Sequence, residues 1–82
     1  TKSQLRRASL SIVLTIAEGS GRSTRPDKRN FFVISRGSVF ECIAALDVLQ
    51  DENCISSEEF QSFYSSGEEL SKMLYSMIKS LS

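Results

Sequence analysis

The chain has 82 residues, with ten Lys or Arg, ten Asp or Glu, no His and two Cys. A chain of this length forms one domain at most and buries a modest share of its surface, so we expect a partner chain to add stability. No apolar run reaches the roughly 18 residues of a membrane span, and no charged-then-apolar leader is present. These features predict a cytoplasmic protein without a membrane partner.

The net charge is zero, but the two signs are separated along the chain. Residues 1–36 carry eight Lys or Arg against two acidic residues, whereas residues 37–82 carry eight Asp or Glu against two Lys. Such asymmetry is typical of a nucleic-acid-binding face, and also of antiparallel helices whose opposite charges attract. Both interpretations stay open at this point.

The first predicted element is a helix over about residues 3–18. Its apolar residues follow helical spacing and cover more than half of the circumference: Leu5, Ala8, Leu10, Ile12, Val13, Leu14, Ile16 and Ala17. A helix with so wide an apolar face is buried on two sides. We expect Gly19 and Gly21 to end it, because glycine readily takes the left-handed conformation of a C-terminal cap.

The stretch AEGSGRS, residues 17–23, has the glycines of a phosphate-binding loop. Such a loop needs a preceding strand and a Lys-Ser/Thr pair, and this stretch has neither. We therefore interpret it as a helix end followed by a turn. Glu18 would oppose the dipole of the first helix, so we expect an ion pair with Arg22, Arg25 or Arg29.

A second helix is predicted over about residues 25–50. Thr24 and Asp27 resemble a capping box, and Pro26 suits a first helical turn. Apolar residues point in most directions around this helix, which makes it the central one: Phe31, Phe32, Val33, Ile34, Val39, Phe40, Cys42, Ile43, Ala45, Val48 and Leu49.

A third helix is predicted over about residues 57–81. Asn53 is the expected break before it, and Ser56 with Glu59 forms a second capping box. The apolar residues of this helix share one compact stripe: Phe60, Phe63, Tyr64, Leu70, Leu74, Met77, Ile78 and Leu81. Its other face is charged and Ser-rich, so we expect that face to point outward.

Strand-type alternation is absent, and the connections between the three helices are short. The sequence therefore predicts an all-α, antiparallel up-down helical bundle in a single domain over residues 1–82. Two of the helices are too apolar for a three-helix monomer, so a further helix or other copies of the chain must cover them. The amphipathic pattern begins within a few residues of Thr1, and we expect a missing N-terminal helix that completes a four-helix unit.

Two groups of charged residues are candidate sites. The basic rim gathers four cations near the first turn, with Ser and Thr hydroxyls beside them, and suits phosphate backbones: Arg22, Arg25, Lys28 and Arg29. Folding the hairpins also brings charged residues of all three helices to one height, Glu68 and Glu69 among them. We expect a structural ion-pair layer, with the turn residue Glu18 as a further ion-pairing site: Arg6, Arg7, Glu18, Arg36 and Glu41.

Nothing in the sequence favours catalysis. There is no His, Cys42 lies on an apolar stripe, and Cys54 lies in a turn without an evident base. Two thiols alone rarely complete a zinc site. We expect no enzyme activity, no cofactor, no metal and no small-molecule substrate.

Three segments together resemble a known family: QLRRASLSIVLTIAEGSGR, FFVISRGSVFE and MLYSMIKSLS. They are similar to the 23S rRNA intervening-sequence proteins, bacterial four-helix-bundle proteins related to the accessory variability proteins of diversity-generating retroelements. The resemblance implies an additional N-terminal helix and a ring-like homopentamer. The retroelement relatives further imply a basic surface that engages nucleic acid and a reverse transcriptase.

The leading hypothesis is a non-enzymatic, oligomeric scaffold that binds RNA or DNA through the basic rim. The alternative is a protein-interaction or structural module with no nucleic-acid role, whose arginines serve ion pairs between helices. The alternative predicts that Arg6→Ala or Glu41→Ala disturbs assembly, whereas substitutions in the basic rim change neither assembly nor activity.

Overall fold

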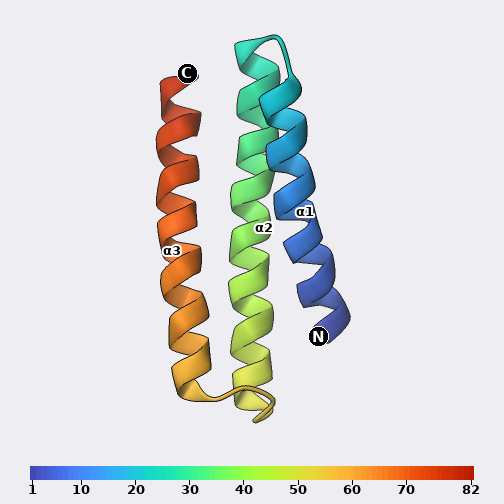
Figure 1. The fold of residues 1–82 in the computed structure, drawn as a ribbon, viewed down its shortest axis with the longest axis vertical. Coiled ribbons are helices and arrows are strands. Elements are labelled where there is room, and N and C mark those ends of the chain that lie inside the picture. Colours follow the sequence, from blue (N-terminus) through green and yellow to red (C-terminus); the bar gives the residue numbers. More distant parts are fainter.

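A computed structural model describes residues 1–82 as three helices without strands (Figure 1). The helices are α1 (Lys2–Gly21), α2 (Arg25–Asp51) and α3 (Ser57–Ser80). Each runs antiparallel to the one before it, and the predicted all-α up-down arrangement is confirmed. None of the three helices has the length and apolar character that crossing a bilayer requires.

The three helices form a single layer with α2 in the middle (Figure 1). Both α1 and α3 pack along α2, whereas the α1 and α3 backbones do not approach each other. The backbone measures 44 × 22 × 13 Å, so the molecule is one helix thick. Consequently α2 is covered on two sides by its neighbours and is open on the two broad faces of the layer.

A small core joins α2 to both neighbours. Phe32 and Val39 of α2 are buried against Leu74 and Ile78 of α3. Partly buried side chains from the three helices and the C-terminal end pack around this cluster: Ile12, Ile16, Ile43, Leu70 and Leu81. Only 13 of the 82 residues are buried, so most of the apolar surface of the helices stays accessible in the single chain.

The end of α1 differs from the prediction. The helix continues through both glycines to Gly21, and neither glycine has a positive φ. The extended backbone of Arg22 ends it instead. Gly19 is buried, and a Cβ atom there would lie 2.9 Å from Cε1 of Phe32. The prediction that Gly19 caps the helix is therefore wrong, since its lack of a side chain serves the packing of α1 against α2.

Hydroxyl groups line the contact between α1 and α2. The Ser38 hydroxyl donates to the Ser11 hydroxyl over 2.9 Å, and the Thr15 and Ser35 hydroxyls share a hydrogen bond. Each of these two hydroxyls also lies within hydrogen-bond distance of a backbone carbonyl one turn back in its own helix. Because a hydroxyl has one proton, one of the two donates to its carbonyl and the other donates across the helix contact. Because a buried hydroxyl needs a partner, these pairs favour one height of α1 along α2.

The remaining helix boundaries follow the expected local chemistry. The Thr24 hydroxyl accepts from the Asp27 N–H over 3.3 Å at the start of α2, whereas the return bond of a capping box, from the Thr24 N–H to the Asp27 side chain, does not form. Asn53 has a φ of 59°, and this left-handed conformation turns the backbone away from the helical path after α2. Ser56 and Glu59 form the reciprocal capping box that begins α3.

Candidate functional site

The four cations of the basic rim lie at the turn between α1 and α2. Arg22 follows the last residue of α1, and the other three lie in the first two turns of α2. This turn and the C-terminus are at the same end of the layer (Figure 1). Ser82 lies against the basic rim, because Nε of Arg29 donates to the Ser82 hydroxyl over 3.2 Å.

Most of the positive charge in the basic rim has no acidic partner. Arg22 forms an ion pair with Glu18 at 3.1 Å, and its guanidinium lies 4.7 Å from the centre of the Phe31 ring. Lys28 donates to the backbone carbonyl of Ser20. The only two ion pairs of the chain are Glu18 with Arg22 and Glu68 with Lys72, so three of the four rim cations keep an uncompensated charge.

The expected ion-pair layer is only partly visible in one chain. Its turn member Glu18 pairs with Arg22, whereas Arg6, Arg7 and Glu41 form no ion pair within the chain. Arg7 and Glu41 line one concavity between α1 and α2. Pairing of these exposed charges stays a prediction.

Arg36 lies in a setting that sequence reasoning missed. It forms no ion pair; its guanidinium lies between the rings of Phe40 and Tyr75, 5.2 and 5.0 Å from their centres. The helical spacing of Arg36 and Phe40 is a signal visible in the sequence. The contribution of Tyr75 depends on how α3 is aligned with α2, for which no local signal exists.

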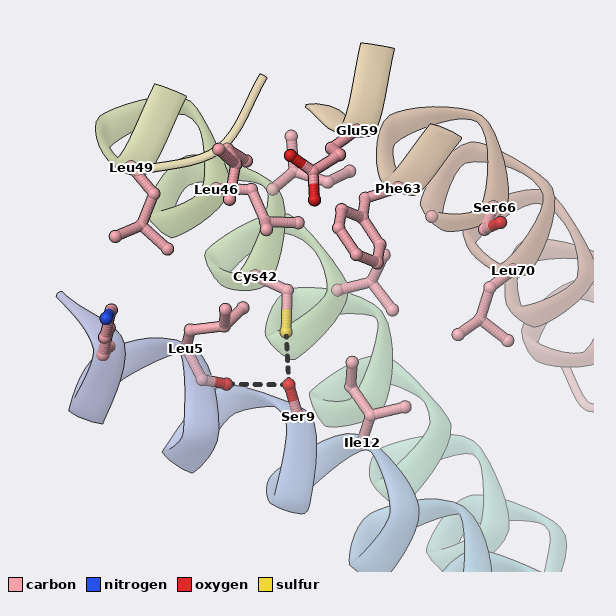
Figure 2. Close-up of a pocket in the computed structure, with 15 residues that line it drawn as sticks. Leu5, Ser9, Ile12, Cys42, Leu46, Leu49, Glu59, Phe63, Ser66 and Leu70 are labelled. Carbon is pink, nitrogen blue, oxygen red and sulfur yellow. Dashed lines mark hydrogen bonds between the residues drawn. The ribbon is translucent and has the colours of Figure 1, made fainter. Parts of the chain in front are cut away.

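An apolar groove opens on one broad face of the layer, with α2 as its floor and α1 and α3 as its walls (Figure 2). Its volume is about 580 Å³. Leu5 and Ile12 reach it from α1, and Phe63 and Leu70 reach it from α3. Ten of its fifteen lining residues are hydrophobic, so the groove suits an apolar side of a helix better than a polar ligand.

The two cysteines are free thiols in different surroundings. Cys42 is buried at the floor of the groove, with Sγ 3.6 Å from the Ser9 hydroxyl (Figure 2). Cys54 is exposed in the turn before α3. No group of three or more His, Cys, Asp or Glu side chains is placed to hold a metal ion.

Glu59 has a shifted pKa in the structure. Its carboxylate accepts a hydrogen bond from the backbone N–H of Ser56 over 2.9 Å, and its own N–H donates to the Ser56 hydroxyl over 3.0 Å. The bond from the Ser56 backbone, with a smaller effect of the Ser56 side chain, lowers the pKa of Glu59 below the usual value of a glutamate. The charged form of Glu59 therefore favours the folded start of α3.

Fold and surface define a small helical protein with a basic end and an uncovered apolar face. The family model described as 23S rRNA-intervening sequence protein matches residues 1–76. This chain belongs to the 23S rRNA-intervening sequence protein family.

A solved structure has the same fold. It is the crystal structure of a protein with unknown function from the S23 ribosomal protein family of Bacteroides thetaiotaomicron. The two chains are 28% identical and superpose with a TM-score of 0.89, over 94% of this chain and 71% of that chain. No curated protein matches this chain.

Proposed function

We propose that this chain is a non-enzymatic scaffold that forms a homo-oligomer and binds RNA or DNA phosphates through its basic rim. The observation that carries the proposal is the uncompensated charge of Arg25, Lys28 and Arg29, gathered at one end of the layer. Phosphate backbones are attracted to such groups, and binding releases counterions from the nucleic acid. Copies of the chain in a ring would repeat the rim and multiply this attraction.

Self-association is supported by the exposed apolar surface. Apart from Phe40 and Tyr75, ten large hydrophobic side chains expose between 37% and 64% of their surface, and the apolar groove adds a further uncovered face. Monomeric soluble proteins rarely expose contiguous apolar patches of large area. We propose that these faces are covered by a fourth helix and by other copies of the chain. The family resemblance implies a homopentamer, which would supply such copies.

The test measures nucleic-acid affinity against salt concentration. The wild type is compared with the double variant Arg22→Ala/Arg25→Ala, using a fluorescently labelled RNA and a DNA of the same sequence. We expect the logarithm of the wild-type affinity to fall steeply with the logarithm of the salt concentration. The double variant should bind more weakly. Its slope of log affinity against log salt concentration should be smaller in magnitude by about two for each copy of the chain that contacts the nucleic acid.

A charge-matched control separates the rim from net charge. The double variant Lys2→Ala/Lys72→Ala loses the same charge at positions away from the turn, and we expect it to bind like the wild type. Absent binding by the wild type, binding that salt leaves unchanged, or equal loss in both double variants would refute the rim as a phosphate site. Retained assembly in all variants, measured by native mass, shows that the effect is on binding.

A further inference from the structure

The Arg36 cradle, formed by Arg36, Phe40 and Tyr75, holds a guanidinium in one orientation. Cζ of Arg36 lies 5.2 Å from the centre of the Phe40 ring and 5.0 Å from that of Tyr75, within the range of cation–π contacts. Nε of Arg36 donates to the backbone carbonyl of Ser71 over 3.2 Å and to its hydroxyl over 3.1 Å. These contacts fix the plane of the group on the α2–α3 surface.

The outer nitrogens of this guanidinium are available to a ligand. No carboxylate lies within ion-pair distance of Arg36, and its two terminal nitrogens form no hydrogen bond within the chain. No buried side-chain nitrogen or oxygen of the chain lacks a partner, so these nitrogens reach solvent. An oriented cation with free donors is suited to an anionic group such as a phosphate.

Exposed aromatic rings and an open hollow lie directly beside the cation. Phe40 and Tyr75 each expose 50% of their surface. A concavity of about 370 Å³ extends from them past Gly37 to Arg29. A Cβ atom added to Gly37 would meet nothing within 4 Å, so the floor of the concavity is unobstructed. A flat aromatic group therefore has both a ring face and space to occupy.

A line of cations joins the Arg36 cradle to the basic rim. Arg25, Arg29 and Arg36 are separated by four and seven residues on α2 and thus share one side of the helix. The line is about 16 Å long at 1.5 Å per residue. Positive charges interleaved with exposed aromatic rings are the pattern of proteins that bind single-stranded nucleic acid.

We propose that the Arg36 cradle binds an unpaired nucleotide of single-stranded RNA or DNA. Its base stacks on the exposed face of Tyr75 or Phe40, and its phosphate accepts hydrogen bonds from the terminal nitrogens of Arg36. This inference rests on the proposed function, because the basic rim holds the flanking phosphates. Bases inside a duplex are already stacked and paired, so the cradle distinguishes a single strand from a duplex of equal charge.

The test compares single-stranded and duplex RNA of equal length, both fluorescently labelled, on the full chain. We expect the wild type to bind the single strand more tightly than the duplex. Tyr75→Ser should weaken single-strand binding about 5- to 150-fold, which corresponds to the loss of one stacked base, and leave duplex binding unchanged. Arg36→Lys should also weaken it, because lysine keeps the charge but not the planar, stacked donor group.

Met73→Ser is the matched control, since Met73 is a large exposed side chain on α3 that lines no concavity and should leave both affinities unchanged. Circular dichroism and native mass of each variant confirm an intact fold and assembly. If the wild type binds single strand and duplex equally well and Tyr75→Ser binds like the wild type, the Arg36 cradle does not bind a nucleotide. Weaker binding by Arg22→Ala/Arg25→Ala would still support the basic rim as a phosphate site. Absence of binding to either RNA or to DNA overturns both proposals.

Discussion

At Gly19 the backbone of α1 lies against two aromatic residues of α2, and this contact has a direct energetic consequence. A Cβ atom at Gly19 would lie 2.9 Å from the Phe32 ring and 3.0 Å from Cβ of Phe31. Phe32 is buried and cannot move aside freely. We expect Gly19→Ala to lower the free energy of unfolding by about 1–3 kcal/mol, as overpacking typically does.

Gly37→Ala is the matched control for this prediction. It adds the same methyl group to a helical glycine, but at a position with nothing within 4 Å. Alanine favours the helix interior, so Gly37→Ala should raise the free energy of unfolding by about 0.5–1 kcal/mol. Urea unfolding of both variants at one protein concentration checks the pair, and an equal effect of the two substitutions would contradict the packing role of Gly19.

Local pairs are the residue-scale features that sequence could predict. Glu18 and Arg22 are four residues apart on a helix, and Ser56 and Glu59 have the spacing of a capping box, so their contacts follow from helix geometry. The setting of Arg36 could not be predicted in the same way. Its ring partner Tyr75 comes from another helix, and the alignment of the two helices depends on packing throughout the core.

The start of α3 carries an element-scale prediction about pH. Because the pKa of Glu59 is lowered in the folded state, its stabilising effect is complete above the usual pKa of a glutamate. This stabilisation is lost as the pH falls through the lowered value. Glu59→Gln keeps an acceptor for the Ser56 N–H but removes the charge. We therefore expect the variant to have a lower melting temperature than the wild type at neutral pH. The difference between the two melting temperatures should narrow as the pH falls.

Thermal unfolding followed by circular dichroism between about pH 7 and about pH 3 measures this difference. Glu69→Gln is the control, because Glu69 lies within α3 and has no hydrogen bond to a backbone N–H. A gap between wild type and Glu59→Gln that stays constant across this range would contradict the role of the charged cap.

Helix number, order and direction could be predicted at the element scale because apolar periodicity and capping residues report them locally. The end of α1 could not. A glycine near a predicted helix end suits both a left-handed cap and a close helix contact, and only the position of Phe32 on α2 distinguishes the two. The hydroxyl pairs between α1 and α2 were missed for the same reason, since Ser11 and Ser38 become partners only after the hairpin has formed.

At the scale of the whole molecule, the thin layer predicts association between chains. Val13 and Leu14 expose 64% and 54% of their surfaces on α1. We expect the native mass of the wild type to be that of an oligomer, two or more times the 9.1 kDa of one chain. The double variant Val13→Glu/Leu14→Glu should fall toward the mass of a single chain, because an interface cannot bury two unpaired carboxylates without a large cost.

Ser65→Glu is the control for added charge, since Ser65 lies on the exposed side of α3, opposite the buried Leu74. It should keep the wild-type mass. Native mass spectrometry and analytical ultracentrifugation provide the measurement, and circular dichroism shows whether the helices persist. A wild-type mass of one chain, or an unchanged assembly of the double variant, would contradict the expectation.

The absence of any approach between the α1 and α3 backbones makes the chain two helical hairpins that share one helix. Every pairing of elements is between sequence neighbours, so each hairpin closes only a short loop when it forms. Topologies built from such local pairings fold in microseconds to milliseconds. We expect either outer helix to detach from α2 while the other stays docked, so that the two hairpins are separate units of local unfolding; amide hydrogen exchange would test this.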